Sequence, residues 1–425
     1  MTVQAAVDVA IVGGGVVGCA CARAAMQAGL RVALFEAQRV GAGATAAGMG
    51  HLVTLDVAVV GGGIVGCACA QAAVAAGLRV AVFEGQRVGA GATAAAMGHL
   101  VVIDDDPAEF ALACLSMRLW RAWSDWGAIE RRATGTLWLA ETVAQREAAH
   151  AKLARLRGAG LDADWLEPDA LHAAEPRLAR DLAGALRVSG DEVAYGPELA
   201  ARLAAGVRAA GGRVAEMTPV ASLRDDGLQL ADGTRVVAGH VLLAAGCDSP
   251  RLWPARAPLP LRPRKGQLAI TDRHPGYIAH ALVELGYIDA AHGDSDESVA
   301  FNAQPRASGQ VLLGSSRSFA DTSPELDAAL LARMVRRAQR FLPDIGQLQM
   351  LRCWAGFRPA TPDGRPIIGR IPGGRDNQWV ATGHEGLGLT TATGTASVWL
   401  DLLRGRAPAI DPAPYAPSRF AQALA

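Results

Sequence analysis

The chain begins with two copies of one unit, and this repeat constrains the fold more than any other feature. Asp8–Leu55 and Asp56–Ile103 align without gaps over 48 positions, of which 38 are identical. Each copy has the pattern of a hydrophobic strand, a glycine-rich turn, an alanine-rich helix and a second strand that ends in an acid, Glu36 or Glu84. One sheet has one place for such a strand, so we predict that only one copy belongs to the main fold.

The second copy carries a glycine pattern typical of dinucleotide-binding turns. Gly61, Gly63 and Gly66 directly follow the hydrophobic strand Val57–Val60. The first glycine permits the tight turn, the second lets the backbone approach a pyrophosphate, and the third lets helix and strand pack closely. The phosphate then lies at a helix N-terminus, where free N–H groups favour an anion. Glu84 ends the next strand, where its carboxylate is placed to accept hydrogen bonds from ribose hydroxyls.

The acid and the residues after it narrow the choice of dinucleotide. A carboxylate at this place disfavours a phosphorylated ribose, and therefore NADP, but leaves both FAD and NAD open. Gly89–Leu100 is a run of small residues just past Glu84. Such a run lets the backbone pass close to a large planar ligand. A nicotinamide dehydrogenase does not need a run of small residues at this place. The sequence therefore favours FAD.

Composition excludes several classes of protein. A chain of 425 residues, 51% hydrophobic and 19% charged, is long and apolar enough for two domains or one large α/β unit. A net charge of zero gives no electrostatic footprint for nucleic acid, and no apolar stretch is long enough for a membrane span. The seven cysteines have neither metal-ligand nor disulfide spacing. We expect no metal and a cytoplasmic location, with peripheral attachment to the inner membrane as an alternative.

Further motifs follow the second copy in a fixed order. They are GHLVVIDDD (Gly98–Asp106), VLLAAGCDS (Val241–Ser249), RKGQ (Arg264–Gln267), FNAQPRASGQVLLGSS (Phe301–Ser316), WAGFRPATPDGRPIIG (Trp354–Gly369) and GHEGLGLTTATGT (Gly383–Thr395). Together with the second copy, these motifs resemble the D-amino-acid-oxidase-like flavoproteins. Within that family the chain is most similar to the branch of glycine oxidase, D-amino-acid dehydrogenase, D-hydroxyproline dehydrogenase and cyanide-forming glycine dehydrogenase.

The resemblance implies an α/β fold with an α+β substrate domain. The FAD-binding domain would be Rossmann-like, of the glutathione-reductase type, and discontinuous, comprising residues 56–126, 195–253 and 352–425. The substrate domain, built on an antiparallel sheet, would comprise residues 127–194 and 254–351. Residues 1–55 are then a surplus unit, because the second copy leads without a break into the rest of the cofactor domain. We expect this surplus unit to pack as an extra layer, to dimerise or to remain partly disordered.

The resemblance also assigns residues to the cofactor. The FAD-binding residues would be Gly61, Gly63, Gly66, Glu84, Ala92, Thr93, Met97, Gly98, Val220, Ala245, Gly246, Gly383, Gly386, Leu387 and Gly388. Val220 would contact adenine through its backbone. Cys353 lies in a region where a related group of oxidases attaches flavin covalently. Its spacing to the sequence TPD (Thr361–Asp363) differs from the spacing in that group, so we expect non-covalent FAD.

Four residues are candidates for catalysis or substrate binding. Arg358 matches the arginine that binds the substrate carboxylate in glycine oxidases, and a guanidinium can grip a carboxylate with two hydrogen bonds; a structural ion pair is the alternative. His99 would lie where the chain crosses the flavin, close to the ring or the substrate amine, or would be a satisfied histidine at a strand start. Asn302 lies on a strand expected to line the pocket, although a solvated strand face would read the same.

Glu385 is the fourth candidate and departs from the family pattern. Glycine oxidases have an aromatic residue and then an arginine where this chain has Glu385 and Gly386. We interpret the change as a shift from glycine towards a substrate with a cationic or hydroxylated side chain, with a surface or capping role as the alternative. Tyr287 and the polar segment His292–Glu297 are predicted to form a mobile lid over the pocket.

The resemblance finally implies an activity. The chain would be an FAD-dependent oxidoreductase that oxidises the C–N bond of a small amino acid or secondary amine. Hydride transfer from Cα to flavin N5 would give an imine, which hydrolyses to a 2-oxo acid. The alternative is the flavin subunit of a hetero-oligomeric dehydrogenase that passes electrons to partner subunits. The sequence leaves open the substrate, its enantiomer, the choice between oxidase and dehydrogenase, and a homo-oligomeric state.

Overall fold

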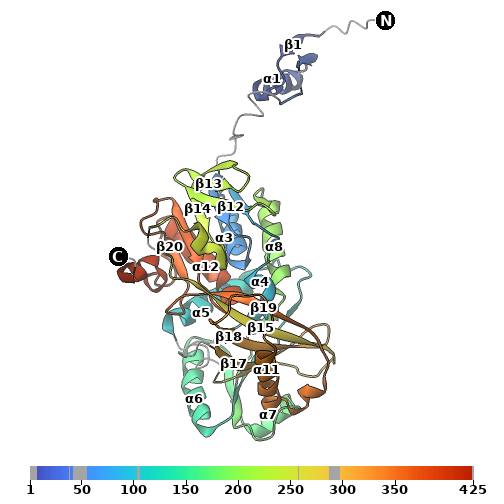
Figure 1. The fold of residues 1–425 in the computed structure, drawn as a ribbon, viewed down its shortest axis with the longest axis vertical. Helices are drawn as coiled ribbons and strands as arrows, with labels where there is room; N and C mark the ends of the chain where they lie inside the picture. Colours follow the sequence, from blue (N-terminus) through green and yellow to red (C-terminus); the bar gives the residue numbers. More distant parts are fainter. Residues whose placement is uncertain are drawn as a thin grey trace.

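Two large sheets form the body of the protein in the computed structural model, which describes residues 7–37, 39–41, 55–102, 106–256, 258–286 and 297–423. Figure 1 shows the body, with the first copy set apart above it. The predicted lid at Tyr287 and residues 292–296 lies outside the described residues. None of the described helices is long and apolar enough to cross a membrane.

The first sheet is built around the second copy. Its eight strands run in the order β11-β4-β3-β14-β13-β12, and β21 joins at β14 with β20 beyond it. The strands are β3 (Leu55–Val60), β4 (Val80–Phe83), β11 (Arg213–Ala215), β12 (Val220–Arg224), β13 (Gly227–Leu230), β14 (Arg235–Leu243), β20 (Ile367–Arg370) and β21 (Gln378–Thr382). β3 pairs in parallel with both β4 and β14, which makes it a central strand.

Both faces of this sheet are covered around its parallel strands, as buried parallel strands require. Val57 and Val59 point into one apolar core, and Ala58 and Val60 point into another on the opposite face. On the first face, α3 packs against α8 and α12, and α12 packs against α5. These helices are α3 (Ile64–Ala75), α5 (Pro107–Ala122), α8 (Gly196–Ala209) and α12 (Gly388–Leu403).

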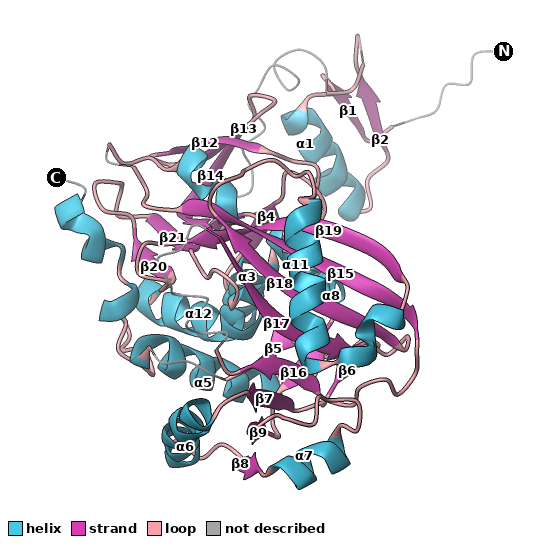
Figure 2. Ribbon diagram, turned by 60° about the horizontal axis from the view of Figure 1, so that its bottom comes forward, coloured by secondary structure: helices cyan, strands magenta, loops and turns pink. Residues whose placement is uncertain are grey.

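The second sheet is mostly antiparallel and follows the order β19-β15-β18-β17-β16-β7-β9-β8. Its strands are β7 (Thr136–Ala140), β8 (Ala163–Leu166), β9 (Gly184–Val188), β15 (Arg262–Arg273), β16 (Ala281–Glu284), β17 (Glu297–Pro305), β18 (Gln310–Ser318) and β19 (Met350–Ala360). Figure 2 shows α11 (Ala328–Phe341), which packs on β17 and β18. The predicted domain boundary at residue 352 falls inside β19, whose pairing with β15 places it in this sheet.

Shorter elements join the two sheets and close the ends of the body. A three-stranded sheet runs β5-β10-β6. The remaining described elements of the body are α4 (Ala92–Ala95), β5 (His99–Leu100), β6 (Arg131–Arg132), α6 (Val143–Gly158), α7 (Pro168–Ala174), β10 (Glu192–Ala194), η1 (Gly246–Asp248), α9 (Ser249–Leu252), η2 (Pro343–Gln347), η3 (Ala413–Tyr415) and η4 (Pro417–Ala423). The predicted α/β fold, with a Rossmann-like sheet and a second, largely antiparallel sheet, is confirmed, although both sheets contain strand pairs of the other orientation.

The first copy folds locally but without a core. β1 (Val9–Val12) and β2 (Val32–Phe35) form a two-stranded parallel sheet on which α1 (Val16–Gln27) packs. Among the described residues of this copy that precede β3, Gly14 alone is buried. Leu55, its last residue by alignment, is buried because it begins β3 of the body. A strand–helix–strand unit of this size cannot bury its own apolar faces, so the first copy exposes what the second copy buries.

Candidate active site

The glycine turn of the second copy is shaped by contacts that exclude side chains. Gly61 has a φ of +107°, and a Cβ on it would lie 2.4 Å from the carbonyl oxygen of Ala244. A Cβ on Gly66 would lie 2.0 Å from the carbonyl oxygen of Gly61. At Gly63, in contrast, the nearest atom to a Cβ is Thr93 Oγ1 at 3.5 Å, which leaves room for a ligand at the start of α3.

Backbone donors fix the carboxylate of Glu84 at the end of β4. Gly62 N donates to Oε2 at 2.6 Å, and Gln86 N donates to Oε1 at 2.7 Å. Each carboxylate oxygen has a further lone pair for a hydroxyl donor. Glu84 lines the same cavity as the glycine turn, so its geometry suits the recognition of a ribose.

One cavity of about 1640 Å³ joins the glycine turn to the second sheet. Pockets for drug-sized ligands are about 300–1,000 Å³, so this one has room for a dinucleotide together with a small substrate. All predicted site residues line it except Gly66 and Gly383. Gly66 packs α3 on the turn, and Gly383 has a φ of +78° and lies against Thr361.

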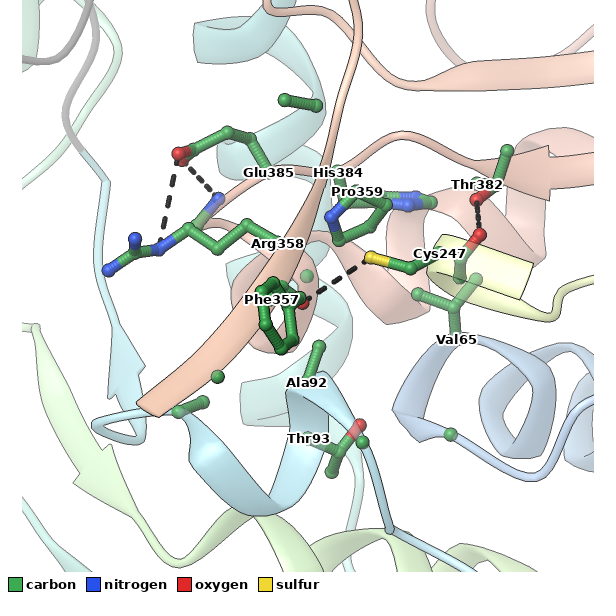
Figure 3. A pocket seen from close by; sticks show the side chains of 18 of the residues that line it. Val65, Ala92, Thr93, Cys247, Phe357, Arg358, Pro359, Thr382, His384 and Glu385 are labelled. Atoms are coloured by element: carbon green, nitrogen blue, oxygen red, sulfur yellow. Dashed lines mark hydrogen bonds and ion pairs between the residues drawn. The ribbon is translucent and has the colours of Figure 1, made fainter. Parts of the chain in front are cut away.

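The residues around the cavity fit the two ends of an FAD molecule. Glu84 and Val220 line it at the sheet of the second copy, and Ala245 and Gly246 line it after β14. Figure 3 shows Cys247 Sγ in contact with the carbonyl oxygen of Phe357 at 3.5 Å, which joins this turn to β19. Ala92, one of the small residues expected to lie beside the flavin, also lines the cavity.

Three arginines surround Glu385 where the cavity meets the second sheet. Glu385 Oε1 lies 3.4 Å from Arg317 Nε, 3.8 Å from Arg264 Nη1 and 4.0 Å from Arg358 Nε. All four side chains line the cavity, and Figure 3 shows Arg358 beside Glu385. Burial alone would raise the pKa of Glu385, but the guanidinium groups of Arg317, Arg358 and Arg264 outweigh it and lower that pKa.

This cluster changes the interpretation of Glu385. Its carboxylate is largely enclosed, with a side-chain exposure of 17%, so a surface role does not apply. Its backbone has a φ of +44°, which turns the side chain towards the arginines, and it also accepts a hydrogen bond from Gly386 N. The sequence suggested that Glu385 would pair with a cationic side chain of the substrate. In the structure its carboxylate already pairs with arginines of the protein, which argues against that role.

Two cavity-lining histidines are neutral at physiological pH. His99 Nε2 lies 2.8 Å from Thr136 Oγ1, and His384 Nε2 lies 2.9 Å from Thr395 Oγ1. Burial lowers the pKa of His99 to about 4 and that of His384 to about 3. Neither imidazole therefore adds a positive charge beside a substrate amine at neutral pH.

Asn302, Gln304 and Arg306 alternate along the predicted pocket strand and its end, and only Asn302 among them lines the cavity. Asn302 is 5% exposed, lines the cavity, and its Oδ1 has no hydrogen-bond partner among the described residues. Arg306 instead pairs with Glu130 at 2.8 Å, and Gln304 is buried away from the cavity. Asn302 is therefore the residue of this strand that is placed to meet a substrate.

Sequence reasoning missed Arg264 and Arg317 as site residues. Arg264 is directly opposite Arg358 in the β15–β19 pairing, and Arg317 lies on β18, the neighbour of β15 on its other side. Arg264 begins the motif Arg264–Gln267, and Arg317 directly follows the motif Phe301–Ser316, but only the strand register shows that the two arginines converge. No group of three or more potential metal ligands occurs in the described part of the chain, and Cys353 is not among the cavity-lining residues.

Comparison with known proteins identifies the family. The family described as "FAD dependent oxidoreductase" (DAO) matches residues 8–55 and again residues 56–402. The D-amino acid dehydrogenase of Cereibacter sphaeroides is 31% identical over 306 residues, 69% of this chain and 66% of that protein. The glycine oxidase of Pseudomonas aeruginosa is 35% identical over 202 residues, 44% of this chain and 51% of that protein. The chain thus spans about two thirds and about half of these two relatives.

Solved structures agree with this assignment. The glycine oxidase of Geobacillus kaustophilus has a TM-score of 0.77 and 29% identity, and the alignment covers 87% of this chain and 99% of that one. The L-proline dehydrogenase of P. horikoshii shares the fold, with a TM-score of 0.79 at 21% identity over 87% of this chain and 98% of that one. The repeated glycine turn, the fixed acid and the cavity between two sheets all occur in a chain that belongs to the DAO family of FAD-dependent oxidoreductases.

Proposed function

We propose that this chain oxidises the C–N bond of a small amino acid or secondary amine, with FAD as the electron acceptor. The observation that carries the proposal is the position of Arg358 on β19, in the wall of the cavity that also contains the glycine turn and Glu84. A guanidinium at this place can hold a substrate carboxylate with two hydrogen bonds. The names of the relatives, D-amino acid dehydrogenase and glycine oxidase, support the same chemistry.

Each residue has a role that its environment supports. Arg358 donates to the carbonyl oxygen of Ser316 on β18 at 3.1 Å, which directs its guanidinium across the intervening strand β15. Asn302 offers an amide oxygen to the substrate amine, and neutral His99 adds no cation to repel it. Bound FAD supplies the acceptor for the hydride that leaves Cα. The protein itself binds the carboxylate and orients Cα.

Absorbance spectroscopy tests the proposal directly. The purified holoenzyme is mixed without oxygen with glycine, sarcosine, prolines and D- and L-amino acids, and loss of the flavin band identifies substrates. Admitting air then separates an oxidase, whose band returns quickly, from a dehydrogenase that needs another acceptor or a partner subunit. A flavin that no amine bleaches would contradict the proposal.

The role of Arg358 has its own test. Arg358→Ala should retain flavin but raise KM for carboxylate substrates by about 10²-fold, because a charged hydrogen-bonded pair contributes about 1.5–3 kcal/mol. Arg352→Ala, on the same strand but exposed, is the matched control and should leave KM unchanged. Equal kinetics for the two variants would remove Arg358 from the carboxylate site.

A further inference from the structure

A buried carboxyl lies behind the part of the cavity wall that His99 forms. Asp191 immediately precedes β10, is 1% exposed, and accepts a hydrogen bond at Oδ1 from Val102 N at 3.2 Å. Its main-chain oxygen accepts from Gly135 N at 3.0 Å, which fixes it beside the start of β7. β10 also pairs with β5, with Val193 opposite His99. Three strands thus meet at a carboxyl to which the proposed reaction assigns no role.

Thr136 on β7 connects this carboxyl to the cavity. Its side chain is fully buried, its Oγ1 lies 2.8 Å from Nε2 of His99, and it hydrogen-bonds to the carboxyl of Asp191. His99 in turn lines the cavity. A chain of hydrogen bonds therefore runs from the cavity wall to a carboxyl that solvent hardly reaches.

This chain has a single direction while Asp191 is ionised. A carboxylate only accepts hydrogen bonds, so the one hydroxyl hydrogen of Thr136 is directed to Asp191. The oxygen of Thr136 then offers only lone pairs to His99, and Nε2 must carry the hydrogen between them. In the neutral ring, Nδ1 is left with a free lone pair on a side chain that lines the cavity. That nitrogen can accept a proton from a ligand.

We infer that His99, Thr136 and Asp191 form a relay that removes the ammonium proton of an incoming substrate. The inference rests on the proposed amine oxidation, in which the nitrogen lone pair must be free before hydride leaves Cα, and adds the path of the proton. The ammonium gives a proton to Nδ1, the Nε2 hydrogen passes to the threonine oxygen, and the hydroxyl hydrogen passes to the carboxylate. The ammonium becomes an amine and the carboxylate becomes a carboxylic acid. After product release, the proton returns along the same path to water in the cavity.

The charged groups around Asp191 suit the end of such a relay. Burial raises the pKa of Asp191 to about 7, and Glu192 on β10, itself paired with Arg131 on β6, adds to the rise. Hydrogen bonds and the charge of Arg121 on α5 oppose it. A carboxyl with this pKa can take up and return a proton near neutral pH. Burial lowers the pKa of His99 to about 4, so the proton does not remain on the imidazole.

Burial also favours the transfer from the side of the substrate. An ammonium loses water when it enters the cavity, and desolvation disfavours its charged form. The transfer then removes one positive and one negative charge from the interior together. Thr136 and Asp191 act on the substrate only through His99, and they are therefore positioning residues.

The pH dependence of anaerobic flavin reduction tests the relay. Asp191→Asn keeps the shape of the side chain but cannot take up the proton. For the parent, kcat/KM should rise through an apparent pKa near 7 and then stay level. The variant reacts only with amine that is already neutral, so its kcat/KM should keep rising about tenfold per pH unit up to the pKa of the amine. Near neutral pH it should be about 10²-fold below the parent, and above the pKa of the amine the two should converge.

A pair of threonine variants separates the relay from stability. Thr136→Val removes the hydroxyl and should give the profile of Asp191→Asn, and Thr136→Ser should restore most of the rate because the hydroxyl returns. Thr271→Val is the matched control, since Thr271 is also a fully buried, hydrogen-bonded threonine but lies outside the cavity lining. It should leave the pH profile unchanged. A loss that is equal at every pH, or no loss at all, in Asp191→Asn and Thr136→Val would overturn the relay.

A binding measurement makes the test independent of turnover. 2-Aminoisobutyrate has an amine and a carboxylate but no hydrogen on Cα, so it cannot be oxidised there. Infrared difference spectra of the holoenzyme at about pH 8, where Asp191 is ionised, should show a protonated carboxyl that forms on binding and is missing in Asp191→Asn. If this signal forms but no amine reduces the flavin, the proposed oxidation fails and the relay stands. If amines are oxidised but no carboxyl becomes protonated, the relay is overturned and the oxidation stands.

Discussion

The two copies of the repeat have nearly the same sequence and nearly the same local structure, but opposite environments. Gly14 N donates to Glu36 Oε2 at 2.6 Å, and Gly62 N donates to Glu84 Oε2 at 2.6 Å. The equivalent valines differ sharply, however, since Val12 is 87% exposed and Val60 is 3% exposed. Local sequence therefore specifies the strand–turn–helix–strand unit, while neighbouring elements decide whether that unit becomes part of a core.

The same contrast explains why the second copy can form part of a cofactor cavity, whereas the first copy has no neighbouring residues to complete one. A Cβ on Gly61 would meet Ala244 at 2.4 Å, whereas a Cβ on Gly13 would have nothing within 4 Å. In the second copy, Ile64 N donates to Thr93 Oγ1 at 3.1 Å, and the turn after β14, with Ala244, Ala245 and Gly246, lines the cavity opposite the glycine turn. The glycine turn by itself supplies an anion-binding site, but binding of a whole dinucleotide also requires the surrounding sheet.

Thiol labelling should show the largest difference between the copies. Cys67 and Cys69 are buried, and burial raises the pKa of Cys67 to about 12 and raises that of Cys69 further. Their equivalents are more accessible, since Cys19 is partly exposed and Cys21 is exposed. Labelling of Cys67 requires opening of the core, so Cys21 should react at least about 10³-fold faster.

Peptide mass spectrometry can follow this labelling, because Arg23 and Gln71 make the two cysteine-containing peptides different in mass. Labelling of both pairs in denaturant is the control. Equal rates in the native protein would mean that the two copies exchange places in the sheet.

Truncation of the equivalent phenylalanines should show the next largest difference. Phe83 is 5% exposed and Phe35 is 57% exposed. Phe83→Ala should lower the free energy of unfolding by about 3–5 kcal/mol, since it removes a core side chain. Phe35→Ala should change it by about 0.5 kcal/mol or less. Urea titration of the body measures both values, and a large effect of Phe35→Ala would show that the first copy belongs to the core.

Removal of the first copy should have the smallest effect. A chain that starts at residue 55, after a new initiator methionine, retains β3 and every described element that packs on it. Its thermal midpoint and flavin content should match those of the full chain. An insoluble or colourless product would show that residues 1–54 support the body.

Sequence alone predicted the parts of the site that depend on local order. The glycine turn, the acid at Glu84 and the small residues at Gly89–Leu100 are close together along the chain, so their pattern is visible in one dimension. Arg264 and Arg358 lie far apart in the sequence and meet only through the register of β15 and β19. No local pattern encodes that register, and this is why the charge of Glu385 was interpreted without the arginines that balance it.

The flavin content of two matched variants tests most directly that the second copy forms the cofactor site. Glu84→Ala and Glu36→Ala remove the same carboxylate from equivalent turns, and bound flavin is measured by absorbance after gel filtration. Loss of the ribose hydrogen bonds should weaken flavin binding by about 10–10²-fold in Glu84→Ala and leave Glu36→Ala yellow. A yellow Glu84→Ala protein beside a colourless Glu36→Ala protein would contradict the account and place the cofactor in the first copy.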